Sequence, residues 1–256
     1  MAPSLQEYLW HKESIPMIKG IYTSASAMRT GIARQDITAN NLANANTTGF
    51  KRDRLFVSEL IRAGENPEEK ALLESVQASR FVEFTPGPLN PTGSDTDFAL
   101  QGKGFFEIAG SDGPLYTRNG RFQRDSAGRL VDTLGRAVQG EGGEITLPEG
   151  VVNVSSSGEI SVNGTVIDKF KVVDFETPQQ LKKTAGAAFS NAEGLAGETT
   201  VDNAQIRQGF LEASNVESMQ EMVEMISTAR NYEMNARLLT TQDQTLQRTV
   251  NDIGRV

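Results

Sequence analysis

Cysteine is absent from this chain of 256 residues, and histidine occurs only once, as His11. The chain therefore forms no disulfide and has no thiol to ligate zinc or to act as a nucleophile. A nucleophile activated by histidine, or a cluster of histidine metal ligands, is equally excluded from the rest of the chain. These absences remove the commonest catalytic and metal-binding arrangements, and we expect no cofactor and no enzymatic activity.

Aromatic residues are scarce, at 7%, and no apolar run approaches the ~18 residues that cross a bilayer. Residues 1–16 lack the continuous apolar segment of a secretory signal peptide, so export would proceed without a cleaved signal. The net charge of −8 and the pI near 4.9 disfavour binding to nucleic acid or to anionic lipid. The sequence thus predicts neither a nucleic-acid partner nor lipid insertion.

The segment from Met17 to Asn44 predicts a helix. Its apolar residues recur at alternating spacings of three and four, the pattern of a coiled-coil seam. The seam comprises Ile18, Ile21, Ala25, Met28, Ile32, Ala39 and Leu42, with Gln35 in the same register. Turn-forming residues from Asn44 to Gly49 end the helix.

A second helix is predicted from Ser214-Asn215 to Ile253. Ser214 and Asn215 are candidate N-caps, and Glu217 would lie in the first turn. The seam is Met222, Met225, Ala229, Tyr232, Ala236, Leu239, Asp243, Leu246, Val250 and Ile253. Such a seam is long for a globular helix and predicts pairing with the first helix or with other subunits.

The middle of the chain has short alternating apolar runs separated by glycine-containing turns such as Ser111-Asp112-Gly113 and Asn163-Gly164, which is typical of an all-β unit. We therefore expect an α+β chain in which long terminal helices form a coiled-coil-like rod segment around a central β-domain. The expected parts are an N-terminal extension (1–16), an N-terminal helix (17–50), a connector (51–73), a β-domain (74–207) and a C-terminal helix (208–256). The connector has a weak helical pattern from Glu68 to Val76.

Three motifs resemble the flagellar rod and hook family of axial proteins. The first runs from Ala39 to Lys51 (ANNLANANTTGFK), and the second, from Ala99 to Phe106 (ALQGKGFF), is followed by the YTRNG run at Tyr116–Gly120. The third begins with Gln208–Glu212 (QGFLE) and continues through Ser214-Asn215-Val216. The resemblance extends from Met17 to about Ile253.

This resemblance implies a structural subunit of the flagellar basal-body rod, a periplasm-spanning drive shaft. The implied partners are other copies, neighbouring rod and hook subunits, and the flagellar type III export apparatus. The small β-domain and the short segment after Lys51 favour a proximal over a distal rod subunit or a hook protein. Family members begin at the position of Met17, so residues 1–16 are a mis-assigned start or a genuine extension, and we favour the former.

The resemblance suggests assembly residues at both ends of the chain. The N-terminal candidates are Asn40, Asn41, Leu42, Asn44, Gly49 and Phe50, and the C-terminal candidates are Asn215, Met222, Met225, Tyr232, Leu239 and Leu246. Asparagine is a poor residue inside a helix, so the clustered amides suggest hydrogen bonds across subunits that fix register; capping and solvation are the alternative. Gly49 would adopt a left-handed turn, and Phe50 would anchor the connector either within one subunit or between subunits.

The two chain ends carry opposite charge. Residues 17–60 hold six basic and three acidic residues, a net of +3, whereas residues 210–256 hold four and seven, a net of −3. This difference favours pairing of the ends, although exposed ion pairs contribute only ~0.2–1 kcal/mol each. The competing hypotheses are a peptidoglycan-processing enzyme, for which Asp95 and Asp97 would be a candidate carboxylate pair, and an export chaperone or binding module with stably folded helices.

Overall fold

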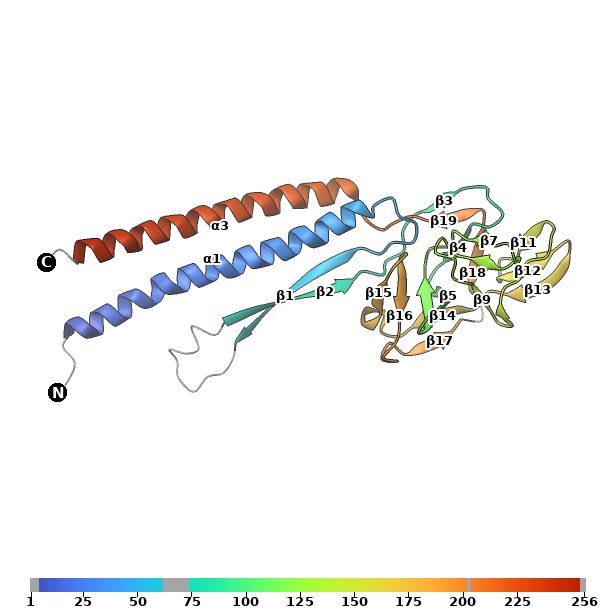
Figure 1. Cartoon of the computed structure of the whole chain (residues 1–256), viewed down its shortest axis with the longest axis horizontal. Helices are drawn as coiled ribbons and strands as arrows, with labels where there is room; N and C mark the ends of the chain where they lie inside the picture. The colour runs from blue at the N-terminus through green and yellow to red at the C-terminus, as the bar shows by residue number, and fades with distance from the viewer. Residues whose placement is uncertain (1–4, 62–73, 202–203, 254–256) are drawn as a thin grey trace. The chain divides into compact units, whose positions relative to one another are not determined.

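The computed structural model describes residues 5–61, 74–201 and 204–253 (Figure 1). A long helix, α1 (Leu5–Ala43), opens the chain, a series of short strands follows, and a second long helix, α3 (Ser218–Ile253), closes it. The expected α+β class, with a helix at each end of a β region, is confirmed. The chain forms two compact units: the described parts of 1–40, 53–81 and 218–256, and residues 41–52 with 82–217.

Helix α1 begins at Leu5, upstream of the expected start at Met17, and ends one residue before the expected Asn44. Its last carbonyls are satisfied by a tightened turn, because the N–H groups of Asn44 and Ala45 donate to the carbonyls three residues earlier, at 3.1 and 3.2 Å. Gly49 then adopts φ +68°, the left-handed turn that was predicted.

Helix α3 ends at Ile253 as expected but begins at Ser218, so the prediction that Ser214 and Asn215 cap it was wrong. The Ser214 hydroxyl accepts from the Val216 N–H at 3.2 Å, and the Asn215 amide bonds to distant segments. The chain bends at Asn215 where these contacts are made, and helical geometry starts only at Ser218.

Within the first unit, α1 and α3 run antiparallel. A Cβ on Gly20 would lie 2.7 Å from Nε2 of Gln242, and Arg34 lines the same groove as Thr228 of α3 (Figure 1). Buried and half-buried side chains recur along α3 at spacings of three and four. They are Glu221, Met225, Thr228, Tyr232, Asn235, Leu239, Gln242 and Leu246. Polar and apolar residues alternate in this series, so its polar members lie seven residues apart.

The connector is not helical where the structure describes it. Strand β1 (Asp53–Ile61) pairs with β2 (Glu74–Val82) in a two-stranded sheet, so the helical pattern predicted over 68–76 was wrong for residues 74–76. Residues 68–73 lie outside the described residues. Arg80 forms an ion pair with buried Asp53 and donates to Oδ1 of Asn40 at 3.3 Å, which ties the strands to α1.

A six-stranded antiparallel sheet organises the second unit, in the order β15-β16-β6-β5-β14-β17. The strands are β15 (Lys182–Thr184), β16 (Ala188–Ser190), β6 (Gly113–Thr117), β5 (Phe105–Gly110), β14 (Val172–Phe175) and β17 (Glu198–Thr200). Adjacent side chains point to opposite faces, so Phe105 and Phe106 enter two different cores. Because both faces are buried, the apolar run of β5 is almost continuous rather than alternating.

Smaller strands pack around this sheet. They are β3 (Leu89–Pro91), β4 (Phe98–Gln101), β7 (Gln123–Arg124), β8 (Leu130–Val131), β9 (Gln139–Gly140), β10 (Gly143–Glu144), β11 (Val152–Val154), β12 (Glu159–Val162), β13 (Thr165–Lys169), β18 (Gln205–Gln208) and β19 (Phe210–Glu212), with a short helix, η1 (Pro178–Gln180). The predicted Asn163-Gly164 turn joins β12 to β13 with both φ angles positive.

Two consecutive turns repeat one arrangement. Asp125 accepts from the N–H groups of Ala127 and Arg129 and pairs with the Arg129 guanidinium. Asp132 makes the same contacts seven residues later with Leu134 and Arg136. The aspartate carboxylate thus replaces main-chain acceptors within each turn, which fixes the turn geometry from a local sequence pattern.

Candidate functional site

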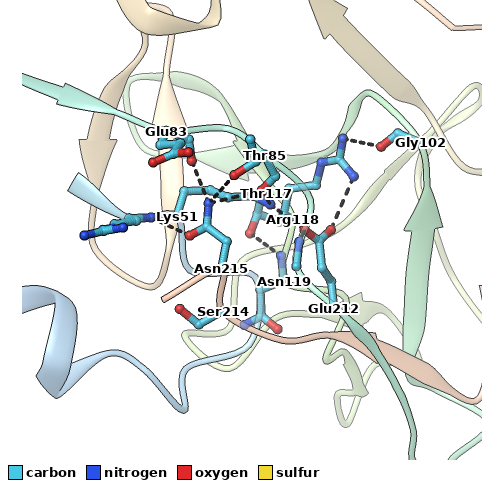
Figure 2. A network of polar contacts seen from close by, with 12 residues as sticks. Lys51, Glu83, Thr85, Gly102, Thr117, Arg118, Asn119, Glu212, Ser214 and Asn215 are labelled. Carbon is cyan, nitrogen blue, oxygen red and sulfur yellow. Dashed lines mark hydrogen bonds and ion pairs between the residues drawn. The ribbon is translucent and has the colours of Figure 1, made fainter. Parts of the chain in front are cut away.

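The three motifs found in the sequence meet in the second unit, at a buried cluster that we term the polar junction. Its members are Lys51, Arg118, Asn119, Glu212 and Asn215 (Figure 2). The Gly49 N–H donates to the Glu212 carbonyl at 2.8 Å, which brings the first motif onto the third. A Cβ on Gly49 would lie only 2.3 Å from the Asn119 nitrogen, so the first motif also packs directly on the second.

Glu212 is the centre of the junction. Its side chain is 1% exposed, yet both carboxylate oxygens have partners. Oε1 pairs with Lys51 and accepts from the Gly87 N–H at 3.0 Å, whereas Oε2 pairs with Arg118 at 3.3 Å. Figure 2 shows Arg118 and Glu212 pointing toward each other from different segments.

Two cations thus share one anion out of contact with water. Burial lowers the pKa of both Lys51 and Arg118, and the Glu212 carboxylate opposes that shift in each case. Carbonyl groups supply the remaining acceptors: Thr85 for Lys51 at 2.9 Å and Gly102 for Arg118 at 2.7 Å. Removing Glu212 would leave two buried charges without a counterion.

Asn215 connects the third motif to the chain on either side of the β1–β2 segment. Its Oδ1 accepts from the Arg52 N–H at 2.7 Å. Its Nδ2 donates to the Glu83 carbonyl at 2.9 Å and to the carbonyl and hydroxyl of Thr85 at 3.1 and 3.0 Å (Figure 2). One amide therefore links the two segments that lead into and out of the β1–β2 pair.

Asn119 connects the second motif to the first through side-chain hydrogen bonds. Its Oδ1 accepts from the Thr48 hydroxyl at 2.7 Å and from the Arg121 N–H at 3.1 Å. Its own N–H donates to Thr117 Oγ1 at 3.0 Å. The contact to Thr48 spans 71 positions of the chain and is made by a side chain that is largely buried.

Phe50 is anchored inside the chain. Its side chain is 6% exposed, and the Lys183 ammonium lies 4.0 Å from the ring centroid. Lys183 also donates to the Lys51 carbonyl. Of the two alternatives for Phe50, these contacts favour anchoring within one subunit.

The predicted asparagines are not equivalent. Asn41 is fully buried, and Leu42 beside it is half-buried. The Asn44 carboxamide accepts from the Thr47 hydroxyl at 3.2 Å, a local turn contact. Asn40 is exposed although it accepts from Arg80, so it is the member of this group most accessible to another subunit.

The predicted residues of α3 divide between two faces. Met225, Tyr232, Leu239 and Leu246 are half-buried and belong to the series that recurs along the helix. Met222 is 40% exposed and lies outside that series. Asn215 precedes the helix and belongs to the polar junction.

Nothing in the junction is arranged for chemistry. Its polar groups bond to one another and to carbonyls, and every charged group is enclosed. Within the described ranges, no cluster of three or more histidine, cysteine or acidic residues is placed to hold a metal ion. No helix in those ranges has the length and apolar character needed to cross a bilayer. The arrangement is suited to fixing three segments of the chain together.

Lys51, Arg118 and Glu212 belong to the three motifs, but no role was predicted for any of them from the sequence. A charged residue beside aromatic or apolar neighbours, as in Phe50-Lys51 and Phe210-Leu211-Glu212, was the available signal. Charged side chains are almost never fully buried unless they are paired. The partners could not be assigned because Lys51 and Glu212 are 161 positions apart.

Three regions of the chain match models of known protein families, and each region contains one of the three motifs. Residues 21–51 match the model described as "Flagella basal body rod protein", and residues 99–167 match "Flagellar hook protein FlgE/F/G D1 domain". Residues 207–253 match "Flagellar basal body rod FlgEFG protein C-terminal". Each match supplies at least one member of the polar junction.

Full-length relatives agree with these matches. The flagellar basal-body rod protein FlgF of Caulobacter vibrioides is 33% identical over 250 residues, covering 94% of this chain and 100% of the relative. FlgF of Salmonella typhimurium is 32% identical over 89% of the chain and 95% of its own length. FlgG of Bacillus subtilis is 30% identical over 92% of the chain and 99% of its own length. The chain belongs to the family of flagellar basal-body rod proteins.

Proposed function

We propose that this chain is a structural subunit of the flagellar basal-body rod and acts mechanically, with no catalytic role. The observation that carries the proposal is the match to rod proteins over nearly the whole chain, with the matched segments converging on one buried junction. A junction that locks three distant segments suits a part that bears load, because it resists separation of those segments.

The subunit polymerises through its two terminal helices, which pair in a coiled-coil-like manner and contact neighbouring copies and other rod or hook subunits. Several bulky side chains of α3 support this, because Met219, Val223 and Ile226 are more than half exposed in the single chain. Repeated contacts that do not close on themselves generate a helical assembly. Torque passes along such an assembly through many packed interfaces.

The terminal helices are expected to be weakly ordered in the free monomer. An isolated pair of helices buries little apolar surface, and the contact between α1 and α3 includes polar groups such as Thr228 and Gln242. Ordering of these helices therefore accompanies assembly. This behaviour suits export through the narrow flagellar type III apparatus to a periplasm-spanning site. Neither nucleic acid nor inserted lipid is a partner in this proposal.

Within the family we favour a proximal rod subunit. Relatives named FlgF and FlgG both match over most of the chain, so the family match alone leaves the choice open. Immunogold labelling of isolated rods tests it, because a proximal subunit would be labelled near the membrane end and a distal subunit near the hook.

The decisive experiment for the function is electron microscopy of basal bodies from a strain lacking this gene. We expect the rod and hook to be missing above the membrane ring and to return when the gene is restored. Complementation from Met17 tests whether residues 1–16 are dispensable. Intact rods and hooks in the deletion strain would exclude a structural rod role.

The relatives do not favour the alternative of a peptidoglycan-processing enzyme, because those described above carry the names of rod proteins. The main chain at the two candidate residues is part of the β-rich unit: the Asp97 main-chain carbonyl accepts from the Gly209 N–H at 2.8 Å, and the Asp95 main-chain carbonyl accepts from the Gln208 side chain at 2.8 Å. An assay of glycan release from purified cell wall would be expected to show no turnover.

A further inference from the structure

Helix α3 has two opposite faces of different character. One contains the series from Glu221 to Leu246 and approaches α1 near Gln242. The other, which we term the outer face of α3, carries bulky apolar side chains that are 54–71% exposed. They are Met219, Val223, Ile226, Met234 and Leu238. With 100° between successive residues, this set lies roughly opposite the buried series, so α1 of the same chain cannot cover it.

Helix α1 also has an outer face, and the side chains on it are mostly small. Ile32 is 48% exposed and is followed on the same side by Asp36 and Ala39, both exposed. Only Ile32 among these three is bulky, so a second helix could approach closely here. The two outer faces thus complement each other in size, one bulky and one small.

Charge also matches between the two faces. Arg230 lies one turn after Ile226 on α3, and Asp36 lies one turn after Ile32 on α1; both are exposed. Among the residues that the structure describes, neither side chain has an ion pair or a side-chain hydrogen bond. Two α3 outer faces placed together would instead bring Arg230 and Arg237 near the same residues of the partner, which like charge disfavours.

The geometry of assembly further restricts the partner. A contact between identical faces is self-complementary and closes into a dimer, whereas a contact between two different faces can repeat along a filament. An open groove of about 420 Å³ borders the outer face of α3, lined by Met219 and Val223 together with Arg34 of α1. It offers space for a side chain of an incoming helix.

We propose that the outer face of α3 binds the outer face of α1 of a second copy of this chain, with Val223 and Ile226 against Ile32 and with Arg230 near Asp36. This inference rests on the proposed rod function and assigns the surface through which consecutive copies join. Exposed apolar stripes of this kind mark interaction sites in soluble proteins.

The absence of cysteine makes a direct test available. Ile32→Cys and Val223→Cys chains, distinguished by a small tag, are expressed together in cells lacking the native copy, and isolated basal bodies are mildly oxidised. We expect disulfide-linked heterodimers of the two variants and no homodimer of either. A disulfide needs Cα atoms within ~7 Å, so the product reports direct contact. A chain carrying both substitutions should give a ladder of covalent multimers.

Met222→Cys is the matched control, because it is exposed at the same level of α3 as Val223 but lies to the side of the outer face. It should give no cross-link with Ile32→Cys. Homodimers of Val223→Cys, or rods containing both variants without any heterodimer, would overturn the proposal. Should either variant fail to enter rods, Ala39→Cys and Met234→Cys, which lie one turn beyond Asp36 and Arg230 in the proposed register, form a second pair with the same expected result.

Charge reversal gives an independent readout. Arg230→Asp and Asp36→Arg should each reduce the number of rods per cell, and the double variant should restore it, because the pair is then reformed in the opposite sense. Additive losses in the double variant would contradict the pairing. A deletion strain that still builds complete rods would instead refute the proposed function, so the two failures are distinguishable.

Discussion

The two units of this protein place their charged and apolar groups in opposite ways. In the β-rich unit, Lys51, Arg118 and Glu212 are buried with partners, and Phe105 and Phe106 fill cores on both faces of one sheet. In the helical unit, the bulky apolar side chains on the outer face of α3 are more than half exposed, and polar residues lie between the helices.

This contrast indicates which part of the chain is complete by itself. The β-rich unit satisfies its buried charges and covers its aromatic residues without any partner. Among the residues that the structure describes, the helical unit leaves the outer face of α3 exposed, and we propose that a second copy covers it. Assembly is therefore expected to order the helical unit and to change the β-rich unit little.

The largest expected effect comes from the centre of the junction. Glu212→Gln removes the counterion of Lys51 and Arg118 and should lower the free energy of unfolding by about 3–5 kcal/mol, because two buried cations lose their partner. Urea denaturation of the purified chain, followed by circular dichroism, measures it. The control is Glu193→Gln in the exposed pair with Lys182, where about 0–1 kcal/mol is expected. Equal effects at the two sites would contradict a special role for the junction.

Gly49 tests the close approach of the first two motifs. Gly49→Ala combines a positive φ with a Cβ that would lie 2.3 Å from main-chain nitrogen, so about 2–4 kcal/mol is expected. Gly93→Ala has a similar φ of +72° and meets nothing within 4 Å, so it should cost only about 1–2 kcal/mol. The difference between the urea-denaturation midpoints of the two variants isolates the contact with Asn119. Equal midpoints would mean that the first and second motifs do not touch.

Asn215→Ala should lower the free energy of unfolding by about 1–3 kcal/mol, because the N–H of Arg52 and the carbonyl of Glu83 lose a shared partner. Hydrogen exchange should increase at Arg52 in this variant. Asn153→Ala is a suitable comparison, because that side chain is exposed and lies on an outer strand. A neutral Asn215→Ala would show that the amide is not needed to hold the strands.

The smallest effects are expected at the repeated turns. Asp132→Asn should be more destabilising than Asp125→Asn, because the Asp132–Arg136 pair is largely buried whereas Asp125 and Arg129 are more exposed. Thermal unfolding of the two variants gives the ranking, and the reverse order would contradict it.

Asp125 also gives a pH dependence. The Arg129 N–H holds the pKa of this carboxyl below its usual value of 3.8, with help from the guanidinium. Its contribution is thus fully present above pH 3.8 and is lost as pH falls through the lowered pKa. The melting temperature should fall less steeply in acid for Asp125→Asn than for the native chain.

Local patterns in the sequence predicted what depends on local physics. The periodicity of residues 222–253 indicated α3, and the Asn163-Gly164 pair indicated the β12–β13 turn. Long-range contacts defeated local rules elsewhere. Asn215 has the chemistry of a helix cap, but distant partners hold it outside the helix, and Ser214 bonds to the Val216 N–H before the helix begins.

The junction shows the same limit at the candidate site. Gly49 and Phe50 were identified from their motif, and the turn at Gly49 was predicted. The pairing of Lys51 with Glu212 depends on the path of the whole β-rich unit between them and has no local signature. The outer face of α3 was not predicted, because the heptad pattern selects Met222 and Met225 and does not include Val223 and Ile226.

Hydrogen exchange compared between the purified monomer and assembled rods tests the central contrast most directly. In the monomer we expect slow exchange around Phe105, Phe106 and Glu212 and rapid exchange along α1 and α3. In rods, the helices should become protected while the β-rich unit changes little. Helices that are fully protected in the monomer, or a β-rich unit that gains its protection only in rods, would contradict the account.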